Sequence, residues 1–244
     1  MFSFFKKQTK PRIDFSVLKT DMHSHLIPGI DDGAPDVDSA VSLIKELQDL
    51  GFRKLITTPH VMADLYPNTP EIIQKGLIEV RQALEVAGID IEIDVAAEYL
   101  MDEAFGEKIE QENLLTLPGN RVLVEMSFVS PAPNLDNYIF QLQLKGYQPV
   151  MAHPERYVYL KSDLKNYTRL KEQGCSLQVN LLSLLGYYGS QVKDTAWKLL
   201  KHKMVDYLGT DLHHAQHATQ LKKVLELPKL ARLLKEHEFA NATL

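Results

Sequence analysis

Short apolar segments alternate with amphipathic segments along most of this chain, and this alternation limits the possible folds more than any other feature. The apolar segments are the expected β-strands, at residues 19–25, 54–60, 93–100, 121–127, 148–155, 176–180 and 205–211. The clearest helical patterns lie between them, at residues 36–50, 71–87, 135–145, 163–173 and 191–203. Alternating strands and helices predict an α/β fold with a parallel sheet, either open and doubly wound or closed as a barrel.

Length and composition favour one large globular domain at residues 19–244, preceded by a short tail at residues 1–18. The chain has 244 residues, of which 45% are hydrophobic and 24% are charged, and this is enough for a sizeable core. The tail has aromatic residues beside lysines but lacks the long apolar core and the cleavage site of a secretory signal. No repeat or low-complexity tract divides the remaining sequence.

Charge and cysteine content exclude several classes of protein. The net charge is -5 and no run of Lys or Arg occurs, which argues against a nucleic-acid-binding groove. A single cysteine, Cys175, excludes an internal disulfide and fits a reducing compartment. No apolar run approaches the roughly 18 residues that span a bilayer. We therefore expect no transmembrane segment and a cytoplasmic location.

Two histidines at the end of the first expected strand form a possible metal-binding pair. Side chains alternate between the faces of a strand, so His23 and His25 point the same way and can bind one ion. Asp32 follows in a loop with Pro and Gly residues, from which its carboxylate can turn back toward the imidazoles. Such a pair also occurs by chance in exposed loops, so the motif needs further ligands.

Further residues of metal-binding type lie at the ends of later expected strands: His60, Glu98, Glu125, His153, Asp211 and His213. The carboxyl ends of parallel strands meet at one edge, which brings distant residues into a common pocket. Each residue also has an ordinary structural interpretation: Glu125 can be a surface residue, His153 a buried histidine and Asp211 a helix cap. However, so many buried acids and imidazoles are costly together unless they are paired or bind cations.

The mixture of nitrogen and oxygen ligands indicates which metals fit. Imidazole with carboxylate suits Mn, Fe or Zn better than Ca, which prefers oxygen alone. Nine candidate ligands are too many for one ion, so we expect two or three divalent transition-metal ions. Clustered ions bind phosphate oxygens and lower the pKa of water, which predicts phosphoester hydrolysis with a metal-bound hydroxide as the nucleophile.

The sequence resembles the polymerase and histidinol phosphatase (PHP) superfamily, and within it the manganese-dependent protein tyrosine phosphatases of bacterial capsule and exopolysaccharide systems. The similar segments span nearly the whole chain in the family's order: DMHSHLIPGIDDG, ITTPH, AAEY, LVEMS, MAHPERY, QVN and GTDLHH. The resemblance implies a distorted (β/α)7 barrel with a metal site at the carboxyl ends of its strands. It also implies a phosphotyrosine protein substrate, expected to be the tail of a membrane-bound bacterial tyrosine kinase.

The resemblance also implies an assignment of ligands to three metal ions, in which Glu98 bridges two of them. One ion would be held by His23, His25, Glu98 and Asp211, a second by Glu98, Glu125 and His153, and a third by Asp32, His60 and His213.

Arg156, in the segment HPERY, resembles the family's phosphate-binding arginine, and its planar guanidinium suits two phosphate oxygens. A surface ion pair with Glu155 or another nearby acid is the structural alternative. The chain departs from the capsule group after the Asp211-His213 motif, where another arginine often follows in that group. The candidates to replace it here are His214, His217 and Lys222.

Three other functions are weighed against the tyrosine phosphatase. A histidinol phosphatase or another small-molecule phosphoesterase of the superfamily would use the same metals, and a non-catalytic metal-binding regulator would keep the fold alone. A thiol-dependent phosphatase would need an arginine a few residues after Cys175, and CSLQVNLL has none. Cys175 is therefore expected to pack as a small apolar residue. Tyr187 and Tyr188 are likewise expected to be packing or loop residues.

Overall fold

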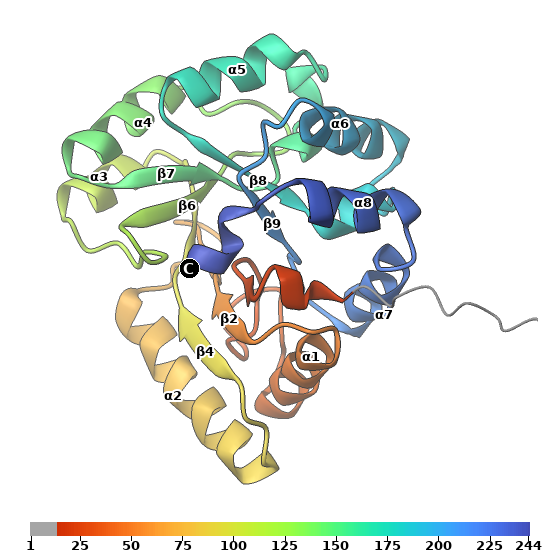
Figure 1. The fold of residues 1–244 in the computed structure, drawn as a ribbon. Helices are drawn as coiled ribbons and strands as arrows, with labels where there is room; N and C mark the ends of the chain where they lie inside the picture. The colour runs from red at the N-terminus through yellow and green to blue at the C-terminus, as the bar shows by residue number, and fades with distance from the viewer. Residues whose placement is uncertain (1–13) are drawn as a thin grey trace, which may run out of the picture.

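The computed structural model describes residues 14–244, and Figure 1 shows helices around a curled layer of strands. The strands are β1 (Thr20–Asp21), β2 (Lys54–Thr57), β3 (His60–Val61), β4 (Glu92–Val95), β5 (Glu98–Leu100), β6 (Arg121–Glu125), β7 (Gln148–Met151), β8 (Ser176–Asn180) and β9 (Tyr207–Gly209). They match the seven expected strand segments, although β3 extends one residue beyond its segment and β4 begins one residue before its own. The strands β2 and β3 form one segment with a short break, as do β4 and β5.

All strand pairs are parallel, and they form one sheet in the order β1-β2-β4 and another in the order β3-β5-β6-β7-β8-β9. The breaks lie at residues 58–59 and 96–97, where Pro59 has no N–H to donate to a ladder. Backbone bonds still cross this region, since Ala96 N donates to Thr57 O at 2.9 Å and Glu98 N donates to Pro59 O at 3.1 Å. The two sheets are therefore one curved wall.

The first and last strand segments meet beyond the ends of β1 and β9. A parallel bridge joins Ser24 to Leu212, and Asp211 N donates to His23 O at 2.8 Å. This contact favours the barrel over the open doubly wound sheet. The prediction of a distorted barrel of seven β/α units is confirmed, and the breaks at residues 58–59 and 96–97 are part of the distortion.

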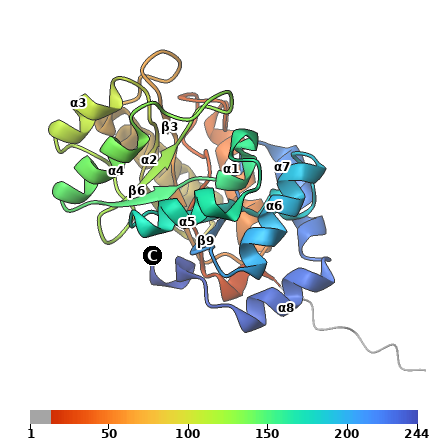
Figure 2. The same ribbon diagram turned by 90° about the horizontal axis from the view of Figure 1, so that it is seen from above.

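The helices lie on the outside of the strands, as the view from above in Figure 2 shows. They are α1 (Val37–Asp49), α2 (Pro70–Ala87), α3 (Phe105–Glu110), α4 (Leu135–Leu144), α5 (Leu164–Glu172), α6 (Ser190–Lys201), α7 (Ala215–Val224) and α8 (Pro228–Glu236). The five expected helices are confirmed, and α3, α7 and α8 are additional. Asp36 caps α1 as expected, because its carboxylate accepts from Ser39 N at 2.8 Å.

Alternation along the strands separates two apolar clusters. Val122 and Val124 of β6 belong to the large cluster that packs with the helices, whereas Leu123 belongs to a smaller cluster with Val150 and Tyr207. Since successive side chains point to opposite faces, the smaller cluster lies on the inner face of the wall. Apolar packing inside the barrel thus supports the polar residues at its carboxyl end.

Packing begins before the expected domain boundary at residue 18. Phe15 lies in a short 3-10 helix (Phe15–Val17), is fully buried, and stacks on Phe52 with ring centroids 5.2 Å apart. The rest of the predicted tail, residues 1–13, lies outside the described residues. None of the helices in residues 14–244 has the length and apolar character that crossing a bilayer requires.

Candidate metal centre

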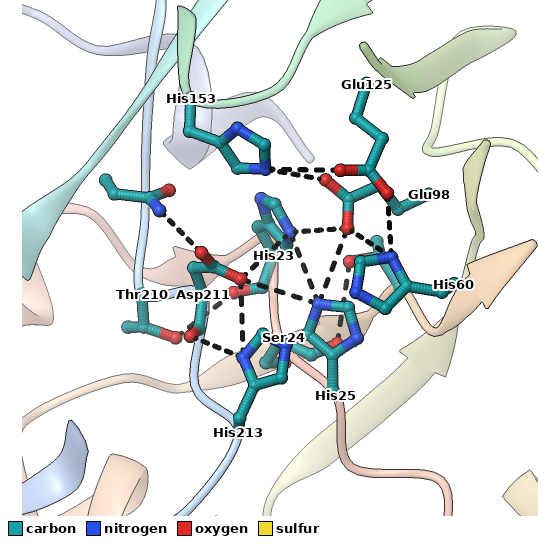
Figure 3. Close-up of polar contacts among 12 residues, drawn as sticks. His23, Ser24, His25, His60, Glu98, Glu125, His153, Thr210, Asp211 and His213 are labelled. Atoms are coloured by element: carbon teal, nitrogen blue, oxygen red, sulfur yellow. Dashed lines mark hydrogen bonds and ion pairs between the residues drawn. The ribbon is translucent and has the colours of Figure 1, made fainter. Parts of the chain in front are cut away.

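The nine predicted metal ligands come together at the carboxyl end of the barrel, and Figure 3 shows most of them facing a common centre. Their side chains make up four overlapping groups of potential ligand atoms lying within 4.8 Å of one another. The groups are His23, His25 and Asp211; His23, Glu98 and His153; His60, Glu98 and Glu125; and His25, Asp32, His60 and His213. Residues nearly 200 positions apart in the sequence thus form one site.

The first strand segment, β5 and the segment after β9 supply the most compact part of the site. His23 Nε2 lies 3.2 Å from Glu98 Oε2 and 3.4 Å from Asp211 Oδ1. His25 Nε2 lies 3.5 Å from each of the same two oxygens. These are the four side chains expected to share one ion, and the alternation of strand faces explains why both imidazoles point inward.

Glu98 connects this part of the site to the next. Its Oε1 lies 3.0 Å from His153 Nε2, while its Oε2 lies 3.1 Å from His60 Nδ1. Glu125 Oε1 lies 2.9 Å from His60 Nδ1, closer than the 3.9 Å between Glu125 Oε2 and His153 Nε2. The central position of Glu98 agrees with a bridging role, and His60 is closer to Glu125 than the predicted grouping implied.

The third part of the site lies at the surface, around Asp32. Asp32 Oδ1 is 3.5 Å from the Nε2 atoms of both His60 and His213. The His213 ring stacks on that of His25 with centroids 3.9 Å apart. Because His60 turns Nδ1 toward the glutamates and Nε2 toward Asp32, it belongs to two parts of the site.

Backbone strain accompanies these positions. His153 and Asp211 adopt positive φ angles of 34° and 52°, a region that residues other than glycine rarely occupy. Gly33 is required for close approach, because a Cβ atom there would lie 2.2 Å from the carbonyl oxygen of His25. Strain of this kind concentrates at functional sites, where surrounding structure maintains it.

The protein alone does not satisfy the polar atoms of the site. Within residues 14–244, the buried atoms His60 Nδ1, Glu98 Oε2 and Glu125 Oε1 have no hydrogen-bond partner, although they lie close together. Burial lowers the pKa of His23, but the Glu98 and Asp211 carboxylates outweigh it and raise that pKa to about 10. The carboxylates therefore need cations beside them, and this donor set fits divalent transition metals.

The glutamate at the end of β6 shows the same charge imbalance. Burial, together with the charge of Glu98, raises the pKa of Glu125 to about 7. In contrast, burial lowers the pKa of His153 to about 4, so this imidazole is neutral and has a free electron pair for a metal.

Arg156 lies at the rim of the site and contacts it directly. Its Nη1 donates to Asp211 Oδ2 at 2.9 Å, so its ion-pair partner is a nearby acid of the candidate metal site and not Glu155. Its guanidinium lies 4.4 Å from the ring centroid of Phe128 and 4.2 Å from that of Tyr188. These residues line a pocket of about 230 Å³ that also includes Asp32, His60, Glu125, His153, Asp211 and His213.

Comparison with known proteins supports the resemblance seen in the sequence. A family model for capsular polysaccharide synthesis, CpsB/CapC, matches residues 19–231. This chain belongs to the CpsB/CapC family. Tyrosine-protein phosphatase YwqE of Bacillus subtilis (strain 168) is 27% identical over 211 residues, which cover 84% of this chain and 83% of YwqE. Tyrosine-protein phosphatase CpsB of Streptococcus pneumoniae is 27% identical over 202 residues, which cover 80% and 82%.

Solved structures agree with this family membership. YwqE and CpsB are described as metal-dependent tyrosine phosphatases, and a crystal structure from that pair matches with a TM-score of 0.78 at 26% identity, covering 88% of this chain and 90% of the other. The lactonase Lmo2620 of Listeria monocytogenes matches with a TM-score of 0.55 at 10% identity, which shows a shared fold alone. The predicted membership of the PHP-type metal-dependent phosphatases is confirmed.

This CpsB/CapC protein holds its candidate ligands with residues that the sequence analysis missed. Asp31 Oδ2 hydrogen-bonds His25 Nδ1 at 2.8 Å and accepts from the backbone N of His60 at 3.1 Å. Gln178 Oε1 hydrogen-bonds His23 Nδ1 at 2.9 Å. Such contacts fix the orientation of ligating imidazoles. The sequence did contain a signal for Gln178. It is a polar residue within the apolar strand segment 176–180, and a buried polar side chain needs a hydrogen-bond partner.

The candidates to replace the family's second arginine differ in position. His214 and His217 line the pocket, whereas Lys222 pairs with Glu46 at 2.6 Å. Burial and the nearby His214 and His213 charges lower the pKa of His217 to about 4. Of the three candidates, the two histidines therefore share the pocket with Arg156.

Cys175 has the environment of a packing residue in this family member. Its side chain is buried, and burial raises the pKa of the thiol to about 12. A thiol in this state is a poor nucleophile. Cys175 is also absent from the residues that line the pocket.

Proposed function

We propose that this protein is a metal-dependent protein-tyrosine phosphatase of a bacterial capsule or exopolysaccharide system. The observation that carries the proposal is the gathering of His, Asp and Glu side chains with unpartnered buried atoms around Glu98, beside a pocket that contains Arg156. Relatives covering most of the chain are tyrosine-protein phosphatases, and a CapC protein of Staphylococcus aureus is a putative one.

Two or three divalent ions are the expected cofactors, with manganese as the first candidate and iron or zinc as alternatives. The residues that would hold them are His23, His25, Asp32, His60, Glu98, Glu125, His153, Asp211 and His213. Bound ions of this type neutralise phosphoryl charge and lower the pKa of water enough to supply a nucleophile at neutral pH. The distance of 3.0 Å between Glu98 and His153 and the distance of 3.2 Å between Glu98 and His23 support Glu98 as a shared ligand.

Arg156 is the residue of this chain that would bind the phosphoryl group. Its guanidinium is held by Asp211 on one edge and by aromatic rings on its faces, so its orientation is fixed before substrate arrives. Preorganised donors of this kind stabilise charge that grows in the transition state. The remaining N–H groups of the fork are suited to two phosphoryl oxygens.

The expected substrate is a phosphotyrosine segment of a protein, namely the tail of a membrane-bound bacterial tyrosine kinase that controls polysaccharide export. The capsule-synthesis family supports this partner, and action on a kinase tail fits a cytoplasmic location. The pocket is smaller than the roughly 300 to 1,000 Å³ of sites that enclose drug-sized ligands. A phosphorylated side chain on an exposed segment suits such a pocket.

Side-by-side turnover tests this proposal. The purified protein is assayed on phosphotyrosine peptides, phosphoserine peptides and histidinol phosphate, with manganese and after chelation. We expect the phosphotyrosine peptides to be hydrolysed fastest and chelation to abolish turnover. Faster hydrolysis of histidinol phosphate would favour the small-molecule phosphatase, and inactivity on all substrates with bound manganese would favour a regulator.

A further inference from the structure

Phe128 is an exposed aromatic residue at the wall of the phosphatase pocket. It follows β6 by three residues, lines the same pocket as Arg156 and Asp211, and is 45% exposed. One face of its ring is covered by the Arg156 guanidinium at 4.4 Å. The exposed part of the ring is therefore available to a molecule that enters the pocket.

The Phe128 ring is held in place from several sides. Its centroid lies 5.6 Å from that of His153 and 5.8 Å from that of Tyr157. These contacts pack the inner part of the ring against the rim and limit its rotation. A rigid ring gives contact area at low entropic cost, because little rotational freedom remains to be lost on binding.

The backbone before Phe128 is also anchored. Met126 N donates to the Tyr157 hydroxyl at 2.9 Å, and the Tyr159 hydroxyl donates to Ser127 O at 2.9 Å. Both tyrosines belong to the segment that carries Arg156. Phe128 and the candidate phosphate-binding residue Arg156 are therefore positioned by one set of contacts.

We propose that Phe128 is a specificity-determining residue whose ring packs on the aryl group of the substrate and favours aryl over alkyl phosphate esters. This proposal rests on the proposed phosphatase function. An ester whose phosphoryl group lies against Arg156 has its carbon substituent immediately beyond, beside the ring that covers Arg156. Tyr188 also lines the pocket and packs on Arg156, but it is less exposed than Phe128. Much of the remaining lining consists of imidazole and carboxylate groups, so Phe128 is the more accessible aromatic carbon surface for the substituent. Aromatic pairs gain energy from offset or edge-to-face packing.

Binding of two inert phosphonates tests this inference without turnover. Phenylphosphonate and methylphosphonate share the charged head, and only the first has an aryl ring. We expect the manganese-loaded wild-type protein to bind phenylphosphonate more tightly, and Phe128→Ala to weaken phenylphosphonate binding by about five- to tenfold. Binding of methylphosphonate, which reports on Arg156 and the metals, should stay within about twofold. Calorimetry measures both affinities.

Two further variants complete the design. Phe128→Tyr keeps an aromatic ring and should restore the preference for phenylphosphonate. Phe140→Ala removes a ring that is 57% exposed on α4 and absent from the pocket lining, so it should change neither affinity. Equal weakening of both phosphonates in Phe128→Ala, or no preference in the wild-type protein, would overturn the inference. Lack of tyrosine phosphatase turnover with a retained aryl preference would instead count against the proposed function alone.

Discussion

Both ends of the barrel bury polar side chains, but within residues 14–244 Asn241 at the amino end is hydrogen-bonded to other protein groups, whereas several side chains at the carboxyl end are not. At the amino end, Asn241 donates to Thr20 O at 3.0 Å and to Leu208 O at 2.7 Å, and it accepts from Leu208 N at 3.0 Å. Closer to the metal centre, Asp21 at the end of β1 accepts from Thr210 N at 3.0 Å and from its hydroxyl at 2.7 Å. These bonds connect β1 with β9 and the residue that follows it. They lie on the amino-terminal side of the parallel bridge between Ser24 and Leu212.

At the carboxyl end, the buried acids and imidazoles have too few partners of their own. His60 Nδ1 lies 3.1 Å from Glu98 Oε2 and 2.9 Å from Glu125 Oε1, yet none of these three atoms makes a hydrogen bond within residues 14–244. Buried polar groups without hydrogen bonds lower the free energy of unfolding. This difference indicates that the polar residues of the amino end contribute to stability. The amino end closes the barrel by itself, whereas the carboxyl end carries a charge imbalance that bound cations would relieve.

The largest expected effect comes from removing a candidate ligand at the carboxyl end. His23→Ala should lower kcat/KM for a phosphotyrosine peptide by about a thousandfold or more, because a bound metal contributes several kcal/mol to the transition state. The variant should also hold fewer equivalents of manganese. Steady-state kinetics and elemental analysis of the same preparation measure both quantities.

A histidine outside the site provides the matched control. His202 is exposed after the end of α6, and His202→Ala should retain activity and metal content. Full activity in His23→Ala would show that His23 is not a required metal ligand. It would also contradict the assignment of the chemistry to the carboxyl end of the barrel.

The next effect concerns phosphate binding at the rim. Arg156→Lys should lower kcat/KM by about a hundredfold, since removing one preorganised donor of charge stabilisation costs about 10²–10³ in rate and lysine lacks the planar fork. Manganese content should stay unchanged. Kinetics with a fixed manganese concentration measure the loss. Arg169→Ala, which removes an exposed arginine that pairs with Asp136 on the outside of the barrel, is the control, and an equal loss there would contradict the assignment.

The structure brings together the candidate ligands named from the sequence, because most of them lie at or near the end of an expected apolar strand segment. A parallel fold turns that position into a shared pocket, so His23, Glu98 and His153 could be identified without knowing any contact. Barrel closure was harder to predict, since Ser24 and Leu212 are linked by backbone bonds that leave no local signal. That part of the fold came from the family resemblance.

The residues that the sequence analysis missed act through contacts distant in sequence. Gln178 lies in β8 but bonds His23 in the first strand segment. Tyr188 was expected to be a packing or loop residue, yet it lines the pocket and covers Arg156. Asn241 is one of several polar residues near the C-terminus, and only its position between β1 and β9 reveals its role.

A smaller effect, on stability alone, is expected at the amino end. Asn241→Ala should lower the free energy of unfolding by about 2 kcal/mol, because three hydrogen bonds of about 0.5 to 1.5 kcal/mol each are lost. Activity at a temperature where the variant is folded should be unchanged. Urea unfolding at one manganese concentration measures the stability.

An exposed asparagine is the control for this change. Asn166→Ala removes one bond to Leu160 O of 2.9 Å at the surface and should cost less than about 0.5 kcal/mol. If folded Asn241→Ala lost its manganese, the two ends of the barrel would be coupled and the contrast between them would fail.

The smallest expected effect is at Cys175, which lies on β8's amino-terminal side, away from the pocket. Cys175→Ala should change kcat/KM by less than about twofold, because the thiol is buried and its pKa is raised to about 12, so it supplies no nucleophile. Iodoacetamide at pH 8 should leave wild-type activity intact, and mass spectrometry should find Cys175 unmodified in the folded protein. Loss of turnover in Cys175→Ala with full manganese content would show that the thiol takes part in the reaction. Retained turnover together with the loss in His23→Ala would place the chemistry at the carboxyl end alone.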